Sequence, residues 1–171
     1  MMKNVISLGF WASAALLAAG ALAAPPDLKT PAPVIYLADN LDEADRLGWC
    51  IDTQGRGLSD RLHAHSCKQQ GGDVQFSFDR DTGQIRSVAF AGLCASYAGT
   101  LPLSLLTCED SEAQAFVYDD TTMTFRPKGN QDTCLVVGDQ SQSAGPFMSR
   151  ALEIASCDKT DDLRKTWIIK P

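Results

Sequence analysis

The sequence is short of the residues on which most catalytic sites depend. It holds only two histidines in 171 residues and has no Gly-x-Ser-x-Gly elbow, His-Glu-x-x-His pair or glycine-rich phosphate loop. Adjacent carboxylates such as Asp119-Asp120 and Asp161-Asp162 lie in turn-like stretches. Such pairs are far more often solvated surface than the acid and base of a glycoside hydrolase. We therefore expect a protein that is not an enzyme and that needs no cofactor.

Positive charge is also scarce. The 15 lysines and arginines stand against 21 aspartates and glutamates, so the net charge is −6 at pH 7. Nucleic-acid binding relies on basic surfaces that neutralise phosphates, so we expect no nucleic-acid partner. The six cysteines include no Cys-x-x-Cys pair, which argues against a zinc ribbon or a thioredoxin-like redox centre.

Residues 1–23 predict a secretory signal peptide. One lysine precedes an apolar run from Val5 to Gly20, and the Ala-Leu-Ala of residues 21–23 supplies a small-x-small cleavage pattern. Proline follows at Pro25 and Pro26, where a transmembrane helix would usually have a charged stop, so we expect no membrane span. We expect a secreted or periplasmic protein whose six cysteines pair in an oxidising compartment.

The next residues divide into a spacer and the start of one domain. Residues 24–33 contain four prolines and predict an extended, semi-rigid spacer. Residues 34–38 predict a short strand. The length of the remaining chain suits a single domain over residues 34–171.

From residue 49 onward, short β-rich runs alternate with Gly, Asp, Asn and Thr turns, which predicts an all-β fold. The runs form three repeats of about forty residues, at about 48–91, 92–131 and 132–171. Each repeat has a cysteine on its opening strand, a second cysteine closing the next strand, and an aromatic residue on the third. The cysteines are Cys50 and Cys67, Cys94 and Cys108, and Cys134 and Cys157, and the aromatic residues are Phe76, Phe116 and Trp167.

The third repeat lacks a fourth strand, and residues 34–38 are a spare strand at the other end of the domain. In a closed barrel with pseudo-threefold symmetry, this strand would complete the last repeat. Closure would also remove the exposed strand edges that promote aggregation. The sequence therefore predicts about twelve short strands in a closed threefold barrel.

The pattern resembles the ricin-type β-trefoil lectin domain, over residues 34–171. That family has an opening strand like Cys-Leu-Asp-Val, a strand ending in Trp-x-Cys, and a Gln-x-Trp signature. Cys50-Ile51-Asp52-Thr53 matches the first element, whereas the other two repeats keep the cysteine and lose the aspartate. The Gln-x-Trp signature is reduced to Val74-Gln75-Phe76, Gln114-Ala115-Phe116 and Lys165-Thr166-Trp167.

The resemblance implies a β-trefoil stapled by one disulfide bond within each repeat. The pairs would be Cys50–Cys67, Cys94–Cys108 and Cys134–Cys157; the sequence alone leaves about fifteen pairings open. The last bridge would close the longest loop, which includes a polar stretch at residues 138–150 with little core of its own.

The resemblance also implies where a sugar would bind. Each pocket of the family uses an aspartate two residues after the first cysteine, an aromatic ring two residues before the second, and a polar side chain before the third strand. In the first repeat these places hold Asp52, His65 and Asp73, and His63 shares a strand face with His65. The corresponding residues of the other repeats suit a sugar poorly and are Ser96, Leu106 and Ala113, and Val136, Ala155 and Arg164.

We therefore expect an exported, non-catalytic carbohydrate-binding protein with a glycan or glycoconjugate partner and at most one sugar pocket, in the first repeat. One alternative is a protein-interaction module that has lost sugar binding, such as a toxin-type accessory subunit or an inhibitor. A hydrolase is a weaker alternative. Asp52, His63 and His65 could also form a three-ligand metal site, but no fourth ligand is evident, so we expect no metal.

Overall fold

The computed structural model describes residues 24–55, 59–69 and 72–171. The predicted signal peptide, residues 1–23, lies outside the described residues. Within them, no helix is long and apolar enough to cross a membrane.

The described chain is built almost entirely from strands, as predicted. Three short 3-10 helices each precede the third strand of a repeat. In chain order the elements are β1 (Val34–Leu37), β2 (Trp49–Thr53), β3 (Leu62–Ser66), η1 (Gly72–Val74), β4 (Phe76–Asp79), β5 (Gln84–Ser87), β6 (Leu93–Ser96), β7 (Ser104–Thr107), η2 (Glu112–Gln114), β8 (Phe116–Asp119), β9 (Thr124–Pro127), β10 (Thr133–Ala144), β11 (Phe147–Ser156), η3 (Asp162–Arg164) and β12 (Trp167–Lys170).

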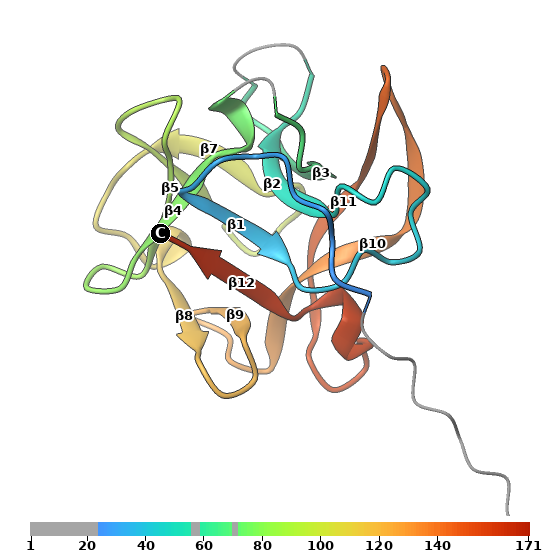
Figure 1. Cartoon of the computed structure of the whole chain (residues 1–171). Coiled ribbons are helices and arrows are strands. Elements are labelled where there is room, and N and C mark those ends of the chain that lie inside the picture. The colour runs from blue at the N-terminus through green and yellow to red at the C-terminus, as the bar shows by residue number, and fades with distance from the viewer. Residues whose placement is uncertain (1–23, 56–58, 70–71) are drawn as a thin grey trace, which may run out of the picture.

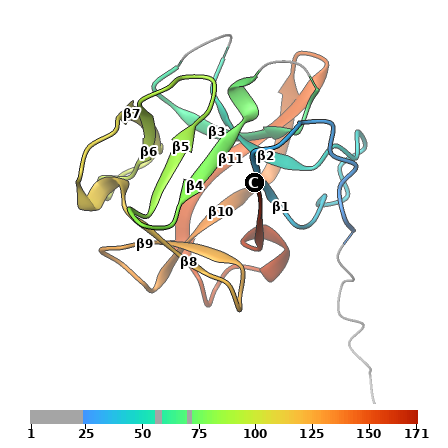
Figure 2. The same cartoon turned by 60° about the vertical axis from the view of Figure 1, so that its left-hand side comes forward.

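The strands form a β-trefoil, which confirms the predicted fold class (Figures 1 and 2). The largest sheet has the order β10-β11-β3-β2-β1-β12, a second has the order β4-β5-β6-β7, and β8 pairs with β9 alone. Strand β1 pairs antiparallel with β12, from Val34 opposite Lys170 to Leu37 opposite Trp167. The first strand of the domain thus supplies the fourth strand of the third repeat.

The core is filled by aromatic and aliphatic side chains from all three repeats. The repeated aromatic residues Phe76, Phe116 and Trp167 are at most 3% exposed. The indole Nε1 of Trp167 donates to the Leu135 carbonyl at 2.8 Å, so its one polar atom is satisfied inside the core. The three disulfide bonds join Cys50 to Cys67, Cys94 to Cys108 and Cys134 to Cys157, as the resemblance implied.

The polar stretch at residues 138–150 is a hairpin rather than a loop. Strands β10 and β11 continue their pairing as far as Ala144 opposite Phe147, with a register shift between Val137 and Ser141. The outer part of this hairpin projects from the body of the trefoil (Figure 1). Its polar side chains are compatible with strand structure because they face water while the backbone groups pair with each other.

Residues 24–33 are extended and lie against the first repeat. The backbone amide of Asp27 donates to the Arg46 carbonyl at 2.7 Å, and Thr30, which is 4% exposed, donates through its hydroxyl to the Lys68 carbonyl at 2.7 Å. Gly48 has a φ of +76°, and a Cβ at this position would collide with the ring of Pro26. This segment, predicted as a spacer, is therefore packed onto the domain.

Candidate functional site

Strands β2 and β3 bring the predicted site residues of the first repeat together. Asp52 lies opposite His63, and Cys50 lies opposite His65. Alternate residues of a strand share a face, so Asp52, His63 and His65 project from the same side of this hairpin. Asp73 reaches the same place from η1.

A lysine that the sequence analysis did not single out links the two aspartates. The Lys68 Nζ lies 3.1 Å from Oδ2 of Asp52 and 3.4 Å from Oδ2 of Asp73. The same Asp52 Oδ2 lies 3.8 Å from His63 Nε2 and 3.7 Å from His65 Nδ1. We call these five residues, Asp52, His63, His65, Lys68 and Asp73, the first-repeat cluster. Asp52 is its centre and is only 1% exposed.

The charge of Asp52 is stabilised by its neighbours. Burial by itself raises the pKa of the Asp52 carboxyl, but the imidazole of His63 and the charge of Lys68, with a contribution from His65, lower the pKa below its usual value. Asp52 is therefore a carboxylate at neutral pH. A buried carboxylate of this kind is a strong hydrogen-bond acceptor.

Three polar atoms of the cluster have no hydrogen-bond partner in the described part of the chain. They are Oδ1 of Asp52, Oδ1 of Asp73 and Nε2 of His63, and all three are buried. Buried polar atoms in folded proteins are nearly always hydrogen-bonded, because leaving one unsatisfied costs free energy. The cluster thus contains two carboxylate oxygens and one imidazole nitrogen whose hydrogen-bonding capacity the described residues leave unused.

His65, the residue expected to stack on a sugar, has little exposed surface in this structure. His65 is 5% exposed, and its ring lies between His63 and Phe147, with centroid distances of 5.4 and 5.8 Å. Its Nδ1 lies 3.1 Å from the Ser66 carbonyl. With 5% of its surface exposed, the ring packs mainly against its neighbours in the hairpin. The half-buried rings of His63 and Phe147 lie nearer the surface.

A hollow of about 420 Å³ adjoins the cluster through His63. It lies where the hairpins of the three repeats meet, and we call it the cap hollow. Its walls include Gln54 and His63 from the first repeat, Leu101 from the second, and Gln142 and Glu153 from the third. His63 therefore has access both to Asp52 and to a cavity large enough for a saccharide.

The equivalent positions of the other repeats have different chemistry. In the second repeat, Ser96, Leu106 and Ala113 line a smaller hollow of about 370 Å³. In the third, Val136 is buried, and the Nε of Arg164 donates to the Val137 carbonyl at 2.7 Å. Neither place offers an aspartate. Across the described ranges, no group of three His, Cys, Asp or Glu side chains could hold a metal ion.

Acidification is expected to destabilise the protein through His65. The pKa of His65 is lowered from its usual value of 6.5, and burial is the main cause. The unfolded chain therefore takes up this proton at a higher pH than the folded chain does. The free energy of unfolding should therefore decrease as the pH falls below 6.5, until the folded state is also protonated, by at most about 1.4 kcal/mol per pH unit for one proton. Urea denaturation between pH 7 and pH 5 measures this slope.

The matched control for this pH dependence is His65→Asn, which can keep a donor near the Ser66 carbonyl but cannot titrate. The slope of the variant should be smaller than that of the parent. Equal slopes in the two proteins would contradict the assignment to His65.

Part of the sequence matches a known protein family. Residues 41–167 match the family described as the ricin-type β-trefoil lectin domain. No curated protein has a detectably similar sequence.

Several solved structures share the fold at low sequence identity. The β-trefoil lectin of the Vibrio vulnificus hemolysin/cytolysin, solved with N-acetyl-D-lactosamine bound, has a TM-score of 0.55 and 13% identity, over 80% of this chain and 90% of that one. The Haemophilus ducreyi cytolethal distending toxin has a TM-score of 0.51 and 16% identity, over 89% of each chain. GalNAc-T7, solved with UDP, GalNAc and Mn²⁺, has a TM-score of 0.53 and 18% identity, over 85% of this chain and 23% of that one.

Proposed function

Because the chain belongs to the ricin-type β-trefoil lectin family, we propose that it is an exported, non-catalytic carbohydrate-binding protein with its sugar site at the first-repeat cluster. The observation that carries this proposal is the convergence of unsatisfied polar atoms around Asp52. Export is supported by the sequence of residues 1–23 and by three disulfide bonds, which persist in oxidising compartments.

The chemistry of the cluster suits a sugar because a sugar presents several hydroxyls on one edge. Two neighbouring hydroxyls can donate to Asp52 and Asp73 in place of the Lys68 ammonium, which holds both carboxylates in the free protein. The lysine side chain is long and flexible, so it can move aside and donate to a third hydroxyl. His63 and Phe147 supply the adjacent apolar surface. At this cluster we expect weak binding of a single free saccharide, with a Kd from millimolar to high micromolar, or about −4 to −6 kcal/mol.

One observation favours a second candidate function. The Lys68 ammonium already bridges both aspartates and Asp52 is 1% exposed, so the cluster is closed in this structure. A cluster that stays closed would make the protein a protein-interaction module on a lectin scaffold. The two functions differ in one measurable respect, because an interaction module should bind no glycan.

A glycan array probed with the whole protein, followed by titration calorimetry, tests the proposal. N-acetyl-D-lactosamine is the first probe for calorimetry, because the V. vulnificus lectin was solved with it bound. We expect Asp73→Asn to weaken binding of the best array glycan about tenfold, the loss of one charge-assisted hydrogen bond. Asp81→Asn, on an exposed turn of the same repeat, should leave the Kd unchanged.

Two results would count against the proposal. An array with no bound glycan would favour the interaction module. If Asp73→Asn and Asp52→Asn both fold and bind the glycan with the Kd of the parent, the sugar binds elsewhere.

A further inference from the structure

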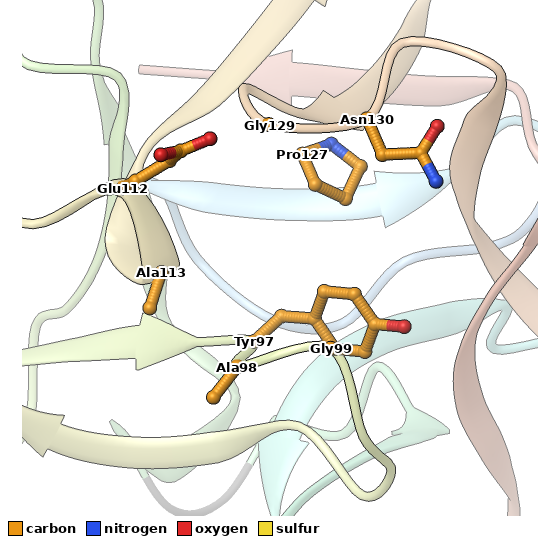
Figure 3. Close-up of a pocket in the computed structure, with 8 residues that line it drawn as sticks. All are labelled: Tyr97, Ala98, Gly99, Glu112, Ala113, Pro127, Gly129 and Asn130. Carbon is orange, nitrogen blue, oxygen red and sulfur yellow. The ribbon is translucent and has the colours of Figure 1, made fainter.

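A second hollow lies away from the first-repeat cluster, and all of the residues that line it belong to the second repeat (Figure 3). Its volume is about 380 Å³. Its walls come from the loop after β6, from η2 and from the loop after β9, and its principal side chains are Tyr97, Glu112, Pro127 and Asn130. We call it the junction hollow.

The polar groups of the junction hollow are available to a ligand. In the described part of the protein, the Tyr97 hydroxyl and the Glu112 carboxylate make no hydrogen bond or ion pair. Asn130 uses only its Oδ1, which accepts from the Asp132 amide at 3.2 Å, so its Nδ2 is free. Figure 3 shows Glu112 and Asn130 on either side of Pro127, across the hollow from the Tyr97 ring. One wall thus carries an acceptor and a donor, and the other carries a flat ring.

The backbone fixes the positions of these groups. The Tyr97 amide donates to the Ala113 carbonyl at 2.7 Å, which ties the ring-bearing loop to η2. Tyr97 is half-buried because part of its side chain packs against the core. Glu112 Oε1 lies so close to Gly129 that a Cβ at this position would collide with it. Glycine at position 129 is therefore what lets the carboxylate lie along this wall.

The charge of the hollow selects among ligands. Glu112 is its one ionisable carboxylate, and its lining contains no lysine, arginine or histidine. An anionic ligand would be repelled with no cation to compensate. A neutral sugar ring fits instead, because its apolar face can pack on an aromatic ring while its hydroxyls reach charged and amide groups.

We propose that the junction hollow is a second saccharide site, which binds a neutral hexose or N-acetylhexosamine residue. The Tyr97 ring packs against the apolar face of the sugar, Glu112 accepts from its hydroxyls, and the Asn130 amide donates to a ring or hydroxyl oxygen. The site rests on the same ligand class as the proposed function but shares no residue with the first-repeat cluster. It adjoins the expected pocket of the second repeat at Ala113, the one residue common to the two linings, but its polar side chains are different ones.

NMR titration of ¹⁵N-labelled protein separates the two sites in one experiment. The probes are methyl β-galactoside, N-acetylglucosamine and N-acetyl-D-lactosamine, with glucuronate as the anionic comparison, each raised to tens of millimolar. We expect a neutral probe, and not glucuronate, to shift the amides of residues 97–99, 112–113 and 129–130. Glu112→Gln should raise the Kd obtained from these junction shifts about tenfold. The Kd obtained from shifts in the first-repeat cluster should be unchanged. Asp110→Asn, an exposed neighbour outside the hollow, is the control.

Gly129→Ala provides an independent variant, because it displaces the Glu112 carboxylate without removing it. Gly129→Ala should also raise the Kd obtained from the junction shifts, as Glu112→Gln does. Shifts confined to the first-repeat cluster would overturn this inference and leave the proposed function standing. Shifts confined to the junction hollow would support this inference and overturn the first-repeat site. If no neutral probe moves the junction amides, the inference is wrong whatever happens elsewhere.

Discussion

Replacing Asp52 by alanine is expected to lower the free energy of unfolding by about 3 kcal/mol, the low end of what removing one partner from a buried ion pair costs. The cost arises because the neighbouring side chains lose their partner when the carboxylate is removed. Lys68, whose side chain is 14% exposed, would keep only Asp73, at 3.4 Å, as a counter-ion. The two imidazoles beside Asp52 would lose the same partner. Urea denaturation at pH 7 measures the change.

A double-mutant cycle shows whether the loss comes from the ion pair. Lys68→Met removes the ammonium and keeps most of the apolar stem. If the pair is responsible, the double variant Asp52→Ala/Lys68→Met should lose less stability than Asp52→Ala and Lys68→Met added together. Exposed ion pairs contribute less than about 1 kcal/mol. A cost of that size for Asp52→Ala, or additive losses in the cycle, would show that Asp52 is not held by a buried ion pair.

Removing the Cys134–Cys157 bridge is expected to cost about 3 kcal/mol, the chain-entropy value for a loop of this order. Its two cysteines are separated by 23 residues, against 14 for Cys94–Cys108. Both cysteines are also nearly buried, at 0% and 6% exposure, so alanine would leave small cavities beside Val136. Thermal and urea denaturation of Cys134→Ala/Cys157→Ala measure the loss.

The matched control is Cys94→Ala/Cys108→Ala, which opens the shorter loop and should lose slightly less stability. The β10–β11 pairing, which runs from Thr133 opposite Ser156, is expected to survive in the unbridged protein. A variant as stable as the parent would show that this hairpin pairing alone holds the loop closed.

The trefoil could be predicted from sequence because its signals are local and occur three times. Cysteines and aromatic residues at matching places in each repeat fixed the number of strands, and the family resemblance then supplied the disulfide pairing. The long hairpin of β10 and β11 could not be predicted in this way. Its outer residues are serines, glutamines and an aspartate, which have low strand propensity, and they form strands here because each pairs with the other arm of the hairpin.

The sequence predicted which first-repeat residues lie close together, but not the charges that surround them. Asp52, His63, His65 and Asp73 do meet, because strand register and the repeat pattern place them together. Lys68 was missed, although a basic residue next to Cys67 and five residues before the predicted Asp73 was a usable signal. The burial of His65 could not be foreseen, because the ring that covers it, Phe147, comes from the third repeat.

The pairing of β1 with β12 has a consequence for the order of folding. The two strands are neighbours in space but come from opposite ends of the domain sequence, so their contact is among the most non-local in the fold. Contacts of this kind form late, because closing so long a loop costs entropy before the contact can stabilise the chain. Until β12 has left the ribosome, β1 lacks this partner and one of its edges is open. The barrel therefore cannot close before the last strand of the domain has been synthesised.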